Sequence, residues 1–220
     1  MALREFVKLP TEWIEQGGLG DLRWKAGEGA DNIAALMTLM AIAHAADEET
    51  GLARMTYDHL EAITHLSRAK VSNGLDVLED RNVIDREPAG RSTFQLVDYG
   101  RVAWGKLPAK GLYRNGGIAA FADFSLRKPV ELNAMKLYFL VVARRGRDTN
   151  VANLSYDKIT EYSGIDRAKL RGAISLLAAA GLVHVEQTFS GVSEFGISNA
   201  YRLAHMDPYF HAGTTGRRSL

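Results

Sequence analysis

The chain of 220 residues contains no cysteine, which excludes disulfide bonds and thiolate-ligated metal sites and fits a reducing compartment. Its N-terminal stretch does not combine a basic end, an apolar run and a cleavage site, as a secretory signal would. No stretch of 18 residues is without charge, which argues against a membrane helix. The sequence therefore predicts a soluble, cytoplasmic protein with no membrane partner.

The sequence also lacks the spacings that are typical of catalytic and metal sites. Its six histidines show no metal-binding motif. The run GRVAWGKL at 100–107 has the glycine spacing of a phosphate-binding loop, but Leu107 replaces the Ser or Thr that binds magnesium, and Pro108 follows where a helix should run. The glycine pairs at 17–18 and 116–117 lie outside any strand–loop–helix unit. We therefore expect no enzymatic activity and no cofactor.

The net charge of +1 conceals a gradient along the chain. Residues 1–63 carry 5 Lys and Arg against 11 Asp and Glu, whereas residues 111–175 carry 11 against 6. The positive excess therefore lies in the middle and the second half. This distribution is compatible with a polyanionic partner, although it is weaker than the basic footprint of many nucleic-acid binders.

One segment of the chain occurs twice. MTYDHLEAITHLSRAK at 55–70 reappears as LSYDKITEYSGIDRAK at 154–169, a shift of 99 positions. Aligning 31–87 with 130–186 gives ten identities, and twelve apolar positions match without a gap between 55 and 84. A shared burial pattern predicts a shared fold. Because the segments at 8–20 and 106–119 also resemble each other, we expect the copies to span 1–104 and 105–207, with a tail at 208–220.

Each copy predicts the same series of elements. A long apolar helix is followed by a short helix that Thr56 or Ser155 caps, a three-residue turn, and a second helix that Ser67 or Asp166 caps. A hairpin then follows, with a longer loop in the second copy. The expected ranges are 31–46, 56–64, a helix after 67, 83–87 and 92–97 in the first copy, and 130–145, 155–162, a helix after 166, 181–187 and 200–206 in the second.

The runs LSRAKVSNGLDVLEDRNVI at 66–84 and IDRAKLRGAISLLAAAGLV at 165–183 resemble the recognition helix and first wing strand of winged helix-turn-helix DNA-binding proteins. The resemblance covers 31–97 and 130–205. It implies a mainly α fold with small β-hairpin wings (α+β), built as two tandem winged helix-turn-helix domains related by the internal repeat. Two such domains in one chain are also similar to plasmid-type replication initiators.

The resemblance implies which side chains face DNA. With Val71, Leu75 and Leu78 turned inward, the polar positions near the helix start are left for the major groove, where Arg and Lys bond guanine or phosphate and Asn bonds adenine. In the second copy the inward residues are Leu170, Ile174 and Leu177. The expected DNA contacts are Ser67, Arg68, Lys70, Ser72, Asn73, Arg91 at the first wing tip, Arg167, Lys169 and Arg171.

The expected function is double-stranded DNA binding by a replication initiator or a transcription regulator of plasmid or phage type. The alternative is a winged-helix adaptor that binds protein or a second copy of itself, which the acidic first third favours. Some residues allow two interpretations. Arg144, Arg145 and Arg147 could clamp phosphate, but capping of the helix C-terminus explains the first two equally well. The second wing offers Ser190, Ser193 and Asn199, and its loop contains no basic residue. Trp104 is expected to fill the space between the two copies.

Overall fold

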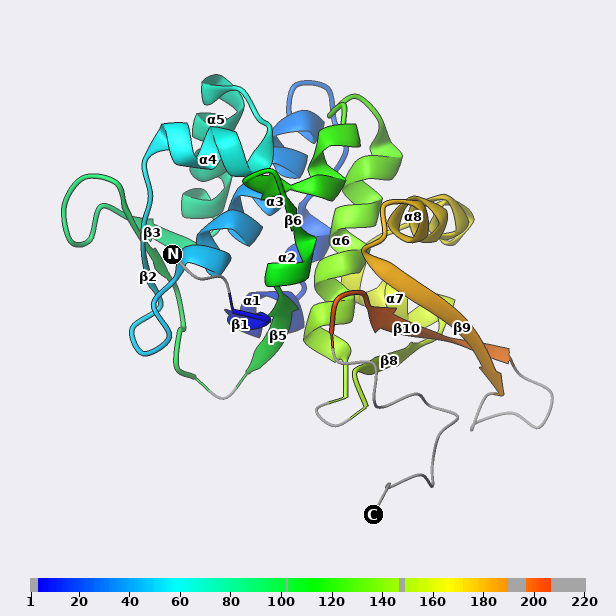
Figure 1. The fold of residues 1–220 in the computed structure, drawn as a ribbon. Coiled ribbons are helices and arrows are strands. Elements are labelled where there is room, and N and C mark those ends of the chain that lie inside the picture. The colour runs from blue at the N-terminus through cyan, green and yellow to red at the C-terminus, as the bar shows by residue number, and fades with distance from the viewer. Residues whose placement is uncertain (1–3, 102, 147–148, 190–196, 207–220) are drawn as a thin grey trace, which may run out of the picture.

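The computed structural model describes residues 4–101, 103–146, 149–189 and 197–206 (Figure 1). It is a mixed α/β structure, about 48% helical, with small antiparallel sheets. Within these residues no helix is both long enough and apolar enough to cross a membrane. Arg147, Ser190, Ser193 and the tail at 208–220 lie outside the described ranges.

The two copies contain the same elements in the same order. The first copy consists of α3 (Gly29–Ala45), β2 (Leu52–Arg54), α4 (Tyr57–Thr64), α5 (Arg68–Asp80), β3 (Ile84–Arg86) and β4 (Thr93–Leu96). The second copy consists of α6 (Pro129–Arg144), β8 (Val151–Leu154), α7 (Tyr156–Ser163), α8 (Arg167–Ala179), β9 (Val183–Phe189) and β10 (Ile197–Leu203). Each copy has a three-stranded antiparallel sheet, ordered β2-β4-β3 and β8-β10-β9. Residues 31–87 and 130–186 therefore share a structure as well as a pattern.

The predicted helices are present, and most of the predicted caps form. Thr56 and Ser155 each accept a backbone hydrogen bond at 3.2 Å, from His59 and Lys158. Ser67 accepts one from Lys70 at 3.4 Å. Asp166 precedes α8 but makes no side-chain bond to the helix backbone, because its carboxylate accepts from the Lys169 ammonium at 2.5 Å instead. The prediction that Asp166 caps α8 through its side chain is therefore wrong.

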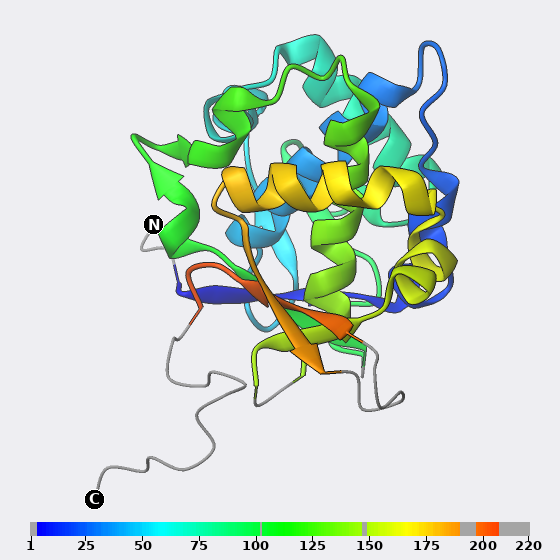
Figure 2. The same ribbon diagram turned by 90° about the vertical axis from the view of Figure 1, so that its right-hand side faces the viewer.

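The long helices α3 and α6 lie side by side at the centre of the molecule (Figure 1). Every residue of α3 from Asn32 to His44 is buried, and so are most residues of α6. Helix α5 packs on α3, and α8 packs on α6. In Figure 2, α8 crosses in front of α6. A helix that is apolar on all sides is stable in water only when neighbours cover it, so this arrangement accounts for the composition of α3 and α6.

Strands β1 (Phe6–Pro10) and β5 (Trp104–Pro108) join the two copies through an antiparallel pair that the sequence did not predict. Lys8 pairs with Lys106, its counterpart in the repeat. Antiparallel pairing of equivalent residues is what a two-fold axis produces, so the copies are related by an approximate two-fold axis. The predicted boundary between residues 104 and 105 falls within β5. Trp104 is 40% exposed with Lys8 beside its ring, so it does not plug the space between the copies.

The segments that precede each copy cross over to the other copy. The first contains α1 (Glu12–Glu15) and α2 (Gly18–Asp21), and α2 contacts α7. The second contains η1 (Lys110–Leu112), β6 (Tyr113–Arg114), β7 (Gly117–Ile118) and η2 (Ala119–Asp123), and β7 contacts α4. Gly17 and Gly116 turn these segments with φ of 87° and 86°, values that favour glycine. The crossing ties the two copies into one unit.

Candidate nucleic-acid interface

Helices α5 and α8 each follow a tight turn after a shorter helix. His65 and Gly164, which end α4 and α7, have φ of 59° and 65°, and the left-handed conformation reverses the chain within three residues. The inner faces are apolar as predicted, with one difference. In α8 the fully buried residue between Leu170 and Leu177 is Ala173, while Ile174 is half-buried against the core. The opposite face of each helix is left to solvent.

Three of the residues that recur between the copies form one cluster, which we call the Tyr–Asp–Arg clasp. Arg68 bonds the Asp58 carboxylate at 2.8 Å, and its guanidinium lies 4.9 Å from the centre of the Tyr57 ring. In the second copy Arg167 bonds Asp157 and lies 5.5 Å from the centre of the Tyr156 ring. Each clasp fastens the start of one helix to the start of the next. The repeated Arg therefore has a structural role in both copies.

Two of the residues of α5 that were predicted to contact DNA, Lys70 and Asn73, bond another residue of the first copy. The Lys70 ammonium lies 2.7 Å from a carboxylate oxygen of Asp31, and the Asn73 amide donates to the same oxygen at 3.1 Å. Asp31 belongs to the first turn of α3. Ser72 is half-buried. The later turns of α5 add three acidic residues, Asp76, Glu79 and Asp80, and no basic residue. Helix α5 therefore carries two cations and three anions.

Helix α8 carries the opposite charge pattern, with Arg167, Lys169 and Arg171 exposed and no acidic residue between Arg167 and Ala179. The position of Asp31 is taken by Val130, so Lys169 bonds only the exposed Asp166 next to it within the described residues. Arg171 has neither an ion pair nor a hydrogen bond in the part of the chain that the structure describes. Lys169 and Arg171 can reach a partner without breaking a contact to the core, whereas Arg167 would have to leave its clasp with Asp157 and Tyr156.

A buried lysine lies on the side of α6 that faces the start of α8. Lys136 is 3% exposed, and its ammonium donates to the Leu22 carbonyl at 2.9 Å. Burial, together with the nearby Arg23, lowers the pKa of Lys136 to about 8 against the opposing effects of Asp21 and Asp166. Its counterpart in the first copy is the fully buried Met37. The second copy therefore buries a cation where the first buries an apolar side chain.

The two wings differ in what they offer. Arg91, between β3 and β4, is exposed and has no ion pair among the described residues. Of the second wing's predicted residues, Asn199 is described, and its amide donates to the Tyr201 hydroxyl at 3.1 Å. Ser190 and Ser193 lie outside the described ranges. The first wing therefore keeps its predicted cation, and Asn199 is directed to its own sheet.

Within the described residues, neither Arg144 nor Arg145 donates a side-chain hydrogen bond to a carbonyl of α6, so the capping interpretation does not hold for them. Arg144 bonds Glu15 at 2.6 Å and stacks at 3.9 Å on the ring of Tyr162. Arg145 donates to the Gly146 carbonyl at 3.2 Å, beyond the helix end. A phosphate clamp would need both guanidinium groups turned toward solvent. Neither arginine is left for that role.

Among the described residues no group of three or more His, Asp or Glu side chains is placed to hold a metal ion. The sequence matches no model of a known protein family, and no curated protein matches it either. The geometry and charge of α5, α8 and their neighbours are therefore the basis for a functional assignment.

Proposed function

We propose that the chain binds double-stranded DNA through two winged helix-turn-helix units, with α8 as the main contact in the major groove. The observation that carries the proposal is the outer face of α8, which presents Arg167, Lys169 and Arg171 with no acidic residue in the helix. Helix α5 and Arg91 contribute secondary contacts. The chain would act as a replication initiator or a transcription regulator of plasmid or phage type.

The order of elements supports this proposal. Each copy runs helix, strand, helix, helix, strand, strand, and its three strands form one antiparallel sheet. This resembles a winged helix, in which the third helix enters the major groove and the hairpin contacts the adjacent backbone. Helices α5 and α8 hold the place of that third helix. The resemblance concerns the fold, so the choice of partner has to come from the side chains.

The chemistry of α8 supports DNA rather than an acidic protein as the partner. Guanidinium and ammonium groups bond phosphate oxygens, and Arg can bond both acceptors of a guanine edge. Ala168, Gly172 and Ser175 are also exposed on α8, and their small side chains allow a groove wall to approach the helix closely. Arg171 is the best candidate for a base contact, because it is tied neither to a clasp nor to a neighbouring carboxylate.

A second candidate function applies to the first copy. The exposed carboxylates of Asp76, Glu79 and Asp80 on α5 would repel phosphate and would suit a basic protein surface. Arg86 neutralises part of this charge by pairing with Asp76 and with Glu79, the latter at 3.2 Å. In this arrangement the chain holds DNA through α8 and a protein partner through α5.

Selection from a random double-stranded DNA library, using the purified chain at low salt, tests the proposal. We expect an enriched sequence motif and an affinity that falls steeply as salt rises, because bound cations release the counterions of the phosphates. Binding to every enriched fragment should be lost when Arg167, Lys169 and Arg171 are all replaced by Ala. No enrichment, together with no binding at low salt, would overturn the proposal.

A further inference from the structure

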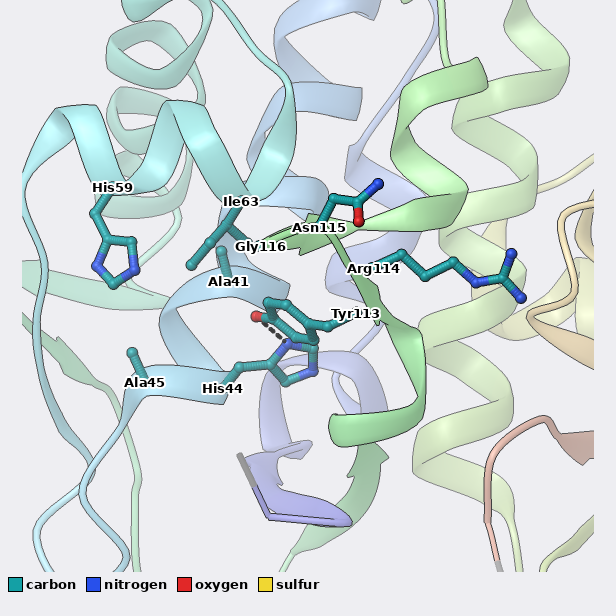
Figure 3. A pocket seen from close by; sticks show the side chains of 9 residues that line it. All are labelled: Ala41, His44, Ala45, His59, Ile63, Tyr113, Arg114, Asn115 and Gly116. Carbon is teal, nitrogen blue, oxygen red and sulfur yellow. Dashed lines mark hydrogen bonds between the residues drawn. The ribbon is translucent and has the colours of Figure 1, made fainter. Parts of the chain in front are cut away.

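A pocket of about 300 Å³ lies between the first copy and the segment that leads into the second. Its walls come from α3, α4 and the β6–β7 turn (Figure 3). Ala41, Ala45 and Ile63 make an apolar wall, while His44, His59 and Tyr113 supply the polar atoms. Figure 3 shows the Tyr113 hydroxyl turned toward His44 and Arg114 extending away from both. The volume is at the lower end of the range for ligand sites, so it suits a molecule of one or two rings.

The equivalent place in the second copy is filled by the protein itself. The counterpart of Ala45 is Arg144, whose guanidinium stacks on Tyr162 and bonds Glu15 at 2.6 Å. Tyr162 and Glu15 are the counterparts of Ile63 and Arg114. The first copy thus has a methyl group where the second has a planar, hydrogen-bonding side chain. This comparison indicates what shape and chemistry the position accommodates.

The hydrogen bonds of His44 decide whether the Tyr113 hydroxyl in the pocket acts as a donor or as an acceptor. His44 Nε2 lies 2.8 Å from the Pro108 carbonyl oxygen, which can only accept, so Nε2 carries the proton. Burial lowers the pKa of His44 to about 4, and the ring is therefore neutral with Nδ1 as an acceptor. The Tyr113 hydroxyl, 3.0 Å from Nδ1, donates its one proton there. Its oxygen is left with lone pairs and no proton for a ligand.

We infer that this pocket binds a small planar aromatic molecule that carries one N–H or O–H donor, such as an indole or a phenol. The apolar wall takes the ring, and the donor bonds the Tyr113 oxygen. The site lies apart from α5 and α8 and does not depend on DNA binding. A bound ligand contacts α3 and α4 of the first copy together with β6 of the second copy's leading segment, so it bridges the two copies.

Indole and 1-methylindole are matched probes for this site, because the methyl group removes the donor and keeps the ring system. Protein NMR of the full chain would follow the Ala41 and Ala45 methyl signals during titration with each probe. We expect saturable shifts at these methyls with indole and an affinity for 1-methylindole on the order of 5-fold lower, as one neutral hydrogen bond predicts. No saturable shift with indole up to about 5 mM would overturn the inference.

Two variants and a control locate the bound probe. Tyr113→Phe removes the hydroxyl acceptor and leaves His44 Nδ1 as a more deeply placed one, so the difference between indole and 1-methylindole should shrink. Ala45→Phe fills the pocket from α3 and should abolish binding of both probes, whereas Ala26→Phe adds the same ring at an exposed site and should leave binding unchanged. If Ala45→Phe kept the wild-type affinity, or if 1-methylindole bound wild type as tightly as indole, the assignment would be wrong. The probe comparison in wild type decides this even if Tyr113→Phe does not fold.

Discussion

Helices α5 and α8 occupy the same place in the two copies, but equivalent basic residues on them bond different kinds of partner. Lys70 bonds Asp31 on α3, while Lys169 bonds, within the described residues, the exposed Asp166 next to it. Ser72 of α5 is half-buried, and its counterpart Arg171 is exposed. The recurring Arg-Ala-Lys forms the same clasp and helix start in both copies, while the exposed positive charge that is not paired with the core lies on α8 of the second copy.

A glutamate introduced at the matched positions 171 and 72 should give the largest difference between the copies, and the change in charge is two units at Arg171 and one at Ser72. Arg171→Glu removes one cation and adds an anion in the expected groove, so we predict a loss of DNA affinity of roughly 100-fold, equivalent to about 2.7 kcal/mol. Ser72→Glu, the matched change in α5, should cost less than about 10-fold. Fluorescence anisotropy with the selected DNA measures both. Equal losses would remove the distinction between α5 and α8.

Lys136→Met gives the second copy the residue that the first has at Met37. The lowering of the pKa from 10.5 to about 8 means that burying the charged ammonium costs about 3 kcal/mol. The variant avoids this cost but loses the hydrogen bond to the Leu22 carbonyl, which is worth roughly 1 kcal/mol. We therefore expect the variant to be more stable than wild type by about 2 kcal/mol at pH 7. Urea unfolding provides the measurement.

The pH dependence of that stability has a defined sign. Folded Lys136 binds fewer protons than the unfolded chain between pH 8 and 10.5, so the unfolding free energy of wild type should rise over this interval relative to Lys136→Met. Below pH 8 the difference between the two proteins should be constant. A difference that shrinks as pH falls from 8 to 6 would contradict the assignment of Lys136 as a buried cation.

The contact of α5 with α3 is closer than a side chain allows. A Cβ on Gly74 would lie 2.8 Å from the carbonyl carbon of Ala34 and 2.9 Å from the nitrogen of Ala35. Gly74→Ala should therefore lower the free energy of unfolding by about 1 to 2 kcal/mol, the cost of overpacking less the gain in helix propensity. Its counterpart in α8 is Ala173, so Ala173→Gly serves as the matched change. Thermal unfolding of Gly74→Ala with unchanged or raised stability would show that α5 can shift without cost.

The two clasps should behave alike, with small effects. Both guanidinium groups are well exposed, at 64% and 63%, and exposed ion pairs contribute about 0.2 to 1 kcal/mol. Double-mutant cycles for Arg68 with Asp58 and for Arg167 with Asp157 measure each coupling by urea unfolding. We expect the two coupling energies to agree within about 0.5 kcal/mol. A measurable coupling energy in one copy alone would mean that the clasp stabilises that copy and not the other.

The helices and hairpins were predictable because their apolar spacing and caps are local. Strands β2 and β8 were missed because three or four residues are too short to show alternation, and β1 and β5 because they pair across nearly 100 residues. For the candidate interface, the sequence predicted which polar residues lie near the starts of α5 and α8, but not which residues they bond. The partner of Lys70, Asp31, lies 39 residues upstream, so only the packing of α5 on α3 brings it within reach. Ile174 was predicted to face inward, but Ala173 is the buried residue and Ile174 is half-buried.

The salt dependence of DNA binding distinguishes α8 from α5 as the helix that contacts phosphate. Two matched variants are compared with wild type: Arg167→Ala, Lys169→Ala and Arg171→Ala together in α8, and Arg68→Ala, Lys70→Ala and Ser72→Ala together in α5, after circular dichroism confirms that both fold. Each lost phosphate contact lowers the slope of log affinity against log salt by about 0.9. We predict that the slope falls by about 2 to 3 in the α8 variant and by less than about 1 in the α5 variant. An equal or larger change in the α5 variant would contradict this prediction.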